Sequence, residues 1–313
     1  MKQAVIDIGS NSVRLTLYEL DGTEFKILFR EKIMAGLAGY VDENGNLSPA
    51  GIECACSGLK IFFDILKSLH IENTAVFATA SLRNINNTNE AVSQIKAACG
   101  YDIEILSEND EALCGYYGAM REFELPDGAF IDVGGGSTEV VTFENAKVID
   151  CISFPIGSLS LYSSCVKKIL PGKGSTERIL GEIKKQTDGC EIFSSYAKRK
   201  VLTGVGGTAR GLLKIAKSCF ELPESCRCIS AYQLGKLTDF LCSGSKKASD
   251  LILKLEPDRI HTIVPGVMIL YHIFRLLGAD ELIVSKYGVR EGYLCTKLYP
   301  SAKENTTALK TVN

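Results

Sequence analysis

Histidine is scarce in this chain, and the cysteine spacing typical of zinc sites is missing. Only three histidines occur among 313 residues, and none lies near a candidate nucleophile. Ser-His or Cys-His acyl transfer therefore has little support. The twelve cysteines contain two close pairs, Cys54/Cys56 and Cys226/Cys228, and neither has the C-x₂-C spacing of a zinc site. We interpret the cysteines as buried, reduced thiols that act as small apolar side chains.

Excess charge and long apolar runs are also missing. The formal net charge is −2, so no bulk basic field favours nucleic acid or a membrane surface. No apolar run approaches the roughly 20 residues that span a bilayer, and the first residues enter a predicted strand without a signal peptide. Apolar residues make up 46% and charged residues 23% of the chain, as in soluble globular proteins. We expect a cytoplasmic protein with no nucleic-acid or membrane partner.

A glycine-rich turn occupies residues 132–139, with the sequence Asp-Val-Gly-Gly-Gly-Ser-Thr-Glu. Apolar runs on both sides predict two strands joined by a tight turn. Consecutive glycines leave backbone N–H groups uncovered, and such a concavity suits phosphate. The carboxylates of Asp132 and Glu139 flank the turn and suit Mg²⁺. An ordinary glycine-rich hairpin is the alternative for this motif taken alone.

A second copy of this pattern lies near the N-terminus. Residues 4–15 read Ala-Val-Ile-Asp-Ile-Gly-Ser-Asn-Ser-Val-Arg-Leu, and Asp7 precedes Asp132 by 125 positions. Without a gap, Gly9 aligns with Gly134 and Ser12 with Ser137. Because an internal repeat decides architecture, we infer two similar domains with two facing phosphate loops.

A third glycine loop follows the predicted strand 200–203. Residues 204–210 read Gly-Val-Gly-Gly-Thr-Ala-Arg and lead into a predicted helix. Glycines at a strand-to-helix turn place N–H groups at a helix N-terminus, where phosphate binds. The loop lacks the P-loop pattern and the third Rossmann glycine, so alone it is a weak signal.

The order of predicted elements repeats as well. The first half reads β-β-β-α-β-α-β-α, with a helix over 48–69 capped by Ser48 and a turn at 81–84. The second half begins in the same way and includes a long helix over 259–277, interrupted or bent at Pro265-Gly266. We predict an N-terminal domain at 1–125, a C-terminal domain at 126–300 whose last helix packs back on the first, and a polar tail at 301–313.

These two units describe an α/β fold with two actin-like (ribonuclease H-like) domains, mixed sheets and an interdomain cleft. Acetate and sugar kinases, heat-shock ATPases and certain phosphatases share this fold, so the fold alone does not select the chemistry.

Several motifs resemble those of the exopolyphosphatase/guanosine-pentaphosphate phosphatase family (Ppx/GppA), in family order. The matching stretches are residues 5–12, 78–84, 105–112, 132–139, 206–208, 264–266 and 289–292. The resemblance covers about residues 3–297. It implies a hydrolase that releases orthophosphate from the terminal phosphoanhydride of inorganic polyphosphate or guanosine pentaphosphate, with Mg²⁺ or another divalent cation. A homodimer is an expectation from the resemblance alone.

The resemblance also implies roles for individual residues. Glu111 matches the catalytic base, and Arg83 would neutralise charge on the phosphoryl oxygens, with Arg14 as a further candidate. The predicted metal ligands are Asp132 and Glu139, with Asp7 as an additional ligand. The predicted phosphate-binding residues are Ser10, Asn11, Ser12, Gly135, Gly136, Ser137, Thr138, Gly206, Gly207 and Thr208.

Some positions depart from the family pattern. Glu108 stands where glycine is common, and Lys286 lies in a stretch that is usually Ser-Asp-Gly. The resemblance is to a short form of the family, for which we expect no helical C-terminal domain. Two alternatives therefore stay open. One is a phosphate or nucleotide sensor without catalysis, and the other is an actin-like ATPase or kinase.

Overall fold

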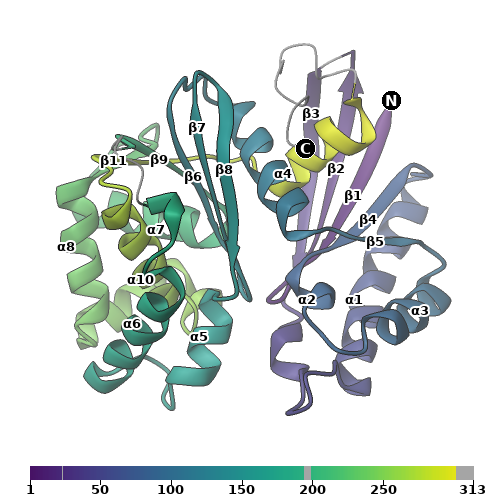
Figure 1. Ribbon diagram of the computed structural model, residues 1–313. Helices are drawn as coiled ribbons and strands as arrows, with labels where there is room; N and C mark the ends of the chain where they lie inside the picture. The colour runs from purple at the N-terminus through teal and green to yellow at the C-terminus, as the bar shows by residue number, and fades with distance from the viewer. Residues whose placement is uncertain (23, 194–198, 301–313) are drawn as a thin grey trace. The chain divides into compact units, whose positions relative to one another are not determined.

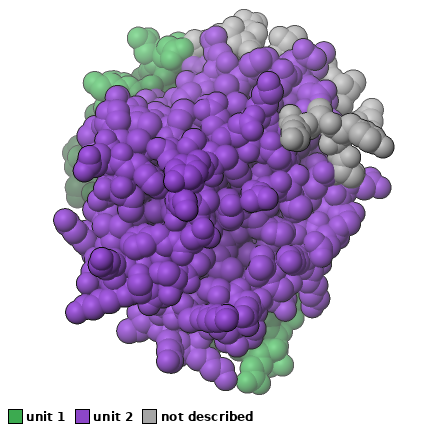
Figure 2. Space-filling model, turned by 90° about the vertical axis from the view of Figure 1, so that its left-hand side faces the viewer, with its two compact units in different colours: residues 1–111, 293–307 green, residues 112–292, 308–313 purple. Residues whose placement is uncertain are grey.

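The protein is described from a computed structural model that covers residues 1–22, 24–193 and 199–300. The chain divides into two compact units, one made of residues 1–111 with the segment that begins at Tyr293, the other of residues 112–292. Figure 1 traces the elements, and Figure 2 colours the two units separately. The boundary predicted at 125/126 stays a prediction, and the predicted tail at 301–313 lies outside the described residues.

The first unit contains a five-stranded mixed sheet with the order β3-β2-β1-β4-β5. Its strands are β1 (Lys2–Ile8), β2 (Val13–Asp21), β3 (Glu24–Ile33), β4 (Thr74–Ala78) and β5 (Ile103–Ile105). Its helices are α1 (Pro49–Ser68), α2 (Ala80–Arg83) and α3 (Thr88–Cys99), with a 3-10 turn η1 (Leu37–Tyr40). The predicted cap of α1 is confirmed, because Ser48 Oγ accepts from Gly51 N at 3.3 Å. The turn predicted at 81–84 is wrong, since these residues form most of α2.

The second unit repeats this sheet and adds one strand, in the order β10-β11-β9-β6-β7-β8. Its strands are β6 (Gly128–Val133), β7 (Thr138–Glu144), β8 (Lys147–Phe154), β9 (Val201–Val205), β10 (Cys228–Ser230) and β11 (Glu281–Val284). The repeat extends to the register of the hairpins. Asp7 lies opposite Arg14 in the β1–β2 pair, and Asp132 lies opposite Glu139, 125 positions later, in the β6–β7 pair.

Helices cover the second sheet. They are α4 (Glu108–Met120, which begins in the first unit), α5 (Ser158–Cys165), α6 (Lys173–Thr187), α7 (Gly206–Phe220), α8 (Ala231–Cys242), α9 (Lys246–Leu255), α10 (Ile263–Leu276) and α11 (Val289–Tyr293). Short turns η2 (Glu191–Phe193) and η3 (Pro257–Arg259) lie between them, and a π-helical turn η4 (Leu294–Leu298) follows α11.

The long helix predicted over 259–277 is wrong at its start. The chain forms η3, and α10 begins only at Ile263, with Thr262 as its N-cap. Pro265 therefore lies in the first turn, where an N–H has no intrahelical acceptor and a proline costs little. Pro265 marks the beginning of a helix and not a bend within one.

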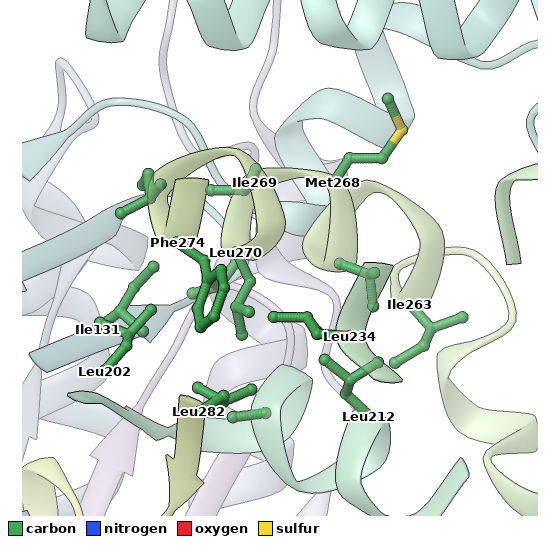
Figure 3. Packing of buried hydrophobic residues seen from close by; sticks show 14 of the residues in the cluster. Ile131, Leu202, Leu212, Leu234, Ile263, Met268, Ile269, Leu270, Phe274 and Leu282 are labelled. Carbon is green, nitrogen blue, oxygen red and sulfur yellow. The ribbon is translucent and has the colours of Figure 1, made fainter. Parts of the chain in front are cut away.

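The central strands β6, β7 and β9 of the second unit are buried on both faces. Ala129, Ile131 and Val133 join a core built with α7, α8 and α10, in which Ile131 and Leu202 lie near Phe274 and Leu270 (Figure 3). On the opposite face, Phe130 packs in a cluster with α4. Such strands read as continuous apolar runs, because both faces of the sheet are covered.

A sequence expectation about the cysteines needs one correction. All twelve cysteines are free thiols, but Cys219 is exposed and only Cys114, Cys165 and Cys295 are fully buried. Burial raises the pKa of the Cys242 thiol to about 11 and, with Asp150 and Glu139 nearby, that of Cys151 to about 12. Within the described part of the chain, no helix is long and apolar enough to cross a membrane.

Candidate active site

The two repeated turns have the same backbone geometry. Gly9 N donates to Ser12 O at 3.2 Å, and Gly134 N donates to Ser137 O at 2.9 Å. A Cβ on Gly9 would lie 3.1 Å from Ser12 O, and one on Gly134 would lie 3.0 Å from Ser137 O. Both turns thus close so tightly that a side chain at their first glycine would need the backbone to shift.

In the first unit, the carbonyl groups of the turn are bound by the segment that follows β3. Ser10 O accepts from Ala38 N, and Asn11 O accepts from Gly36 N, both at 3.0 Å. This segment therefore fixes the orientation of the two peptide groups.

In the second unit, the N-terminus of α5 has the same role. Gly134 O accepts from both N and Oγ of Ser158 at 2.9 Å. Gly135 O accepts from the N–H groups of Leu159 and Ser160 at 2.9 and 3.0 Å. The helix N-terminus that another fold would offer to an anion is here used to hold the glycine turn.

With the carbonyls fixed, the remaining polar feature of both turns is their backbone N–H groups. No acceptor within the described chain is found for six of them. Backbone N–H groups of such partly or fully buried residues require an acceptor, and a group of them facing one concavity binds anions. These six belong to Ser10, Asn11, Ser12, Gly135, Gly136 and Ser137.

The third loop comprises the end of β9 and the N-terminus of α7, which starts at Gly206. No side chain caps this helix, so the first-turn N–H groups of Gly206, Gly207 and Thr208 have no intrahelical acceptor. Thr208 Oγ1 donates to Val133 O at 3.1 Å. Ser81 Oγ makes the equivalent bond to Ile8 O in the first unit.

The structure gives less support to the predicted phosphate contact of Thr138 than to those of the turn N–H groups. Thr138 is fully buried, and its hydroxyl donates to Ile156 O at 2.7 Å. Its hydroxyl hydrogen is therefore engaged inside the protein, and its phosphate contact stays a prediction.

Two carboxylates lie side by side in the second unit. Asp132 and Glu139 are directly opposite in an antiparallel pair, so both side chains project from the same face of the sheet. Glu139 is 1% exposed, and its Oε1 accepts from Ser153 Oγ at 3.0 Å. Mg²⁺ in phosphate-processing sites is held by one or two carboxylates together with substrate phosphates. The pair fits that requirement, although no group of three metal-binding side chains occurs among residues the structure describes.

The first residue of α7 leaves room for the Asp132 side chain. A Cβ on Gly206 would lie 2.3 Å from Asp132 Oδ1, and Gly206 has φ +75°. Both the contact and the left-handed backbone require glycine here.

Asp7 has a different environment in the first unit. It lies opposite Arg14, whose Nε donates to Ser12 Oγ at 3.0 Å. A cation thus stands where the second copy has Glu139. The predicted metal contact of Asp7 stays a prediction.

Arg83 and Glu111 are brought together in the first unit. Arg83 Nη1 lies 2.8 Å from Glu111 Oε2 and donates to Leu106 O at 2.9 Å. Glu111 is 8% exposed, although it lies in the first turn of α4. Arg83 is at the end of α2, which follows β4, and Leu106 follows β5, so both lie at the carboxyl ends of parallel strands, where ligands bind in such sheets.

The other edge of the Arg83 guanidinium is open for an acceptor. Its Nε and Nη2 are buried and have no hydrogen-bond partner in the described chain. Glu108 Oε1 lies 4.0 Å from Nε, too far for a hydrogen bond. Two adjacent donors of this kind match the oxygens of a phosphoryl group.

Arg259 is a site residue that sequence reasoning missed. A Cβ on Gly207 would lie 1.7 Å from Arg259 Nη2, so the guanidinium lies directly against the N-terminus of α7. Burial lowers the pKa of Arg259, and Glu256, Asp258 and Asp132 oppose that shift. Arg259 lies in η3, where the sequence predicted a continuous helix. The only sequence signal for this contact is the glycine at position 207, which leaves room for the arginine side chain.

Lys286, a departure noted above, makes local contacts in the second unit. Its N–H donates to Glu122 Oε2 at 2.8 Å, and its Nζ lies 3.6 Å from Glu122 Oε1.

Turns with exposed backbone donors, facing carboxylates and largely buried arginines are features of phosphoryl-binding proteins with an actin-like fold. The chain belongs to the Ppx/GppA phosphatase family, whose model matches residues 16–300. That match begins after the first glycine turn, so the Asp7 motif rests on the repeat and the structure. The resemblance to this family, inferred from the motifs, is confirmed, and the family makes the chain a phosphatase.

Solved structures of similar fold match nearly the whole chain. An exopolyphosphatase from Cytophaga hutchinsonii is 20% identical with a TM-score of 0.85, covering 95% of this chain and 98% of that one. The Aquifex aeolicus PPX-GPPA enzyme is 27% identical with a TM-score of 0.75, covering 95% and 99%. The predicted actin-like fold class is confirmed.

Proposed function

We propose that the protein hydrolyses the terminal phosphoanhydride of inorganic polyphosphate or guanosine pentaphosphate and releases orthophosphate. Family membership and the exopolyphosphatase likeness support the reaction class. The open N–H groups of the two turns support a substrate with several phosphates. A cytoplasmic location and a homodimer stay predictions.

The candidate site residues have separate roles in the proposed reaction. Glu111 takes the proton of the attacking water, and its bond to Arg83 holds the carboxylate in place. In the first unit, the free edge of Arg83 binds oxygens of the reacting phosphoryl group, and the turn at Ser10–Ser12 binds a neighbouring phosphate. In the second unit, the turn at Gly135–Ser137 is a further phosphate-binding element. A divalent cation held by Asp132 and Glu139 would neutralise phosphate charge.

The contact between Arg83 and Glu111 carries this proposal, since it joins a candidate base to a phosphate-binding cation. The test is release of orthophosphate from polyphosphate with and without Mg²⁺, in the native protein and in Glu111→Gln. We expect a loss of at least about 100-fold in kcat for Glu111→Gln. Glu72→Gln, at an exposed position of the same unit, is the matched control. Undiminished turnover in Glu111→Gln would reject this base.

Glu108 favours a second candidate, a phosphate or nucleotide sensor. Its carboxylate lies 4.0 Å from Arg83 Nε and competes with a phosphate for that donor. Tight binding of tripolyphosphate without any phosphate release would support the sensor. ATP-dependent phosphorylation of a small molecule would support a kinase.

A further inference from the structure

Arg259 is tied to a carboxylate at the edge of its guanidinium that is remote from Gly207. Its Nε lies 3.3 Å from Glu256 Oε2, three residues earlier in the chain. Among the residues the structure describes, this is the only ion pair of Arg259. The two Nη nitrogens lie against Gly207, since a Cβ there would be 1.7 Å from Nη2 and 2.5 Å from Nη1. The ion pair therefore leaves both Nη groups at the N-terminus of α7.

Two glycines of α7 make room for this pair of side chains. Gly207 and Gly211 are four residues apart, so they lie on the same face of the helix. A Cβ on Gly211 would lie 3.3 Å from Glu256 Oε2 and 3.4 Å from Arg259 Cδ. The carboxylate and the arginine stem therefore pack closely over Gly211, and the guanidinium reaches Gly207. Both side chains are largely buried there, with exposed fractions of 16% for Arg259 and 19% for Glu256.

The position of Arg259 is unfavourable on electrostatic grounds unless carboxylates stabilise it. A helix N-terminus carries a partial positive charge, so a guanidinium placed against it is repelled. Burial also disfavours the charged form and lowers the pKa of Arg259, and of the carboxylates that oppose this shift Glu256 acts most strongly. Without Glu256, we expect the arginine side chain to turn away from the N-terminus of α7.

Glu256 is itself held in place by its surroundings. Its N–H donates to Ile252 O at 2.7 Å at the end of α9, and its carbonyl accepts from Arg259 N at 2.9 Å. Its Oε1 lies 3.2 Å from Lys214 Nζ. An arginine side chain alone has several rotatable bonds, and holding it in one orientation costs conformational entropy. A carboxylate fixed in this way reduces that cost before a ligand arrives.

We propose that Glu256 is a positioning residue for phosphate binding, which holds Arg259 so that both Nη groups face a phosphoryl group at the N-terminus of α7. This role rests on the proposed function, because it requires phosphate oxygens at that helix end. Glu256 acts only through Arg259 and touches no substrate.

The test is a double-mutant cycle on the affinity for a methylene-bridged analogue of tripolyphosphate, which cannot be hydrolysed, measured by calorimetry. Arg259→Met keeps the apolar stem but removes the guanidinium, and we expect it to weaken binding about tenfold. Glu256→Ala should weaken binding about fivefold in the otherwise native protein and less than about twofold in the Arg259→Met protein. Glu256→Gln should retain the affinity within about twofold, because its amide oxygen still accepts from Nε.

Two control variants separate this role from general effects of charge. Glu224→Ala removes a carboxylate that pairs with Lys217 of the same helix at 3.3 Å. Lys214→Ala removes the other partner of Glu256. Both should leave the affinity within about twofold of the native value, since surface pairs of this kind contribute little. Urea unfolding of each variant measures any loss of stability separately.

Two results would overturn the role of Glu256 while the proposed function stands. One is a loss of affinity in Glu256→Ala that is equally large with and without Arg259, as a merely structural role would give. The other is a Glu256→Ala protein that binds the analogue as tightly as the native protein does. If the native protein does not bind the analogue at millimolar concentration, the proposed function itself is rejected.

Discussion

Gly157→Ala should displace the glycine turn of the second unit while leaving the fold intact. Gly157 has φ −137° and ψ 171°, which alanine adopts without strain. The effect of the new methyl group is therefore steric. It would lie 2.3 Å from both C and O of Gly135 and 2.5 Å from Gly136 N.

The magnitude follows from these distances. Moving a 2.3 Å approach to an ordinary van der Waals contact shifts the Gly135–Gly136 backbone by about 1 Å. A misplacement of that size in a binding group costs about 100-fold in rate. Overpacking of this kind lowers the free energy of unfolding by about 1–3 kcal/mol.

The assay is kcat/KM for phosphate release, together with urea unfolding of the same samples. Gly181→Ala is the control, because this α6 glycine has no atom within 4 Å of an added Cβ. It should keep full activity and gain about 0.5–1 kcal/mol of stability. If Gly157→Ala unfolded like the native protein and retained activity within threefold, the turn would not bind phosphate in the way we infer.

Three further changes test other parts of the structure. Gly207→Ala would force only the flexible end of Arg259 to move, so we expect about tenfold weaker tripolyphosphate binding with unfolding unchanged; equal loss of stability and affinity would contradict this. Gly118→Ala would place a Cβ 2.0 Å from Gly288 O, a backbone atom, and should cost at least about 3 kcal/mol in urea unfolding; a neutral effect would refute the close packing of α4 and α11. Burial lowers the pKa of His272, so the unfolded chain binds more protons than the folded one. The free energy of unfolding therefore falls as pH drops below about 6.5, by no more than about 1.4 kcal/mol per pH unit. His272→Gln should flatten that slope between pH 5 and 7.

The repeated turns could be predicted because their signal is local. The glycines, the leading aspartates and the apolar strands fix both hairpins, and a fixed offset of 125 positions predicts one register for both. This sequence offset alone aligns Asp132 with Asp7. The repeat also predicts two similar domains, and the strand order of the first sheet recurs in the second.

Arg259 and β10 could not be predicted, because both depend on distant partners. Arg259 reaches Gly207 across more than fifty residues, and nothing near it in the sequence marks it as a site residue. β10 has only three residues, too few for a period-2 pattern, and exists through pairing with β11. The start of α10 was mispredicted for a related reason. The helix was predicted to begin at Arg259, within η3, and only backbone geometry shows that Pro265 lies in the first turn of α10.

The difference between the two turns explains how one repeated element can have two roles. Both copies leave three N–H groups open, so either can hold phosphate oxygens. They differ in the residue opposite the aspartate. Arg14 lies opposite Asp7 in the first copy, whereas Glu139 lies opposite Asp132 in the second. Two adjacent carboxylates repel one another unless a cation or proton lies between them. We therefore expect a divalent cation to bind beside the carboxylates of the second copy, where the positive charge of Arg259 also acts on Asp132.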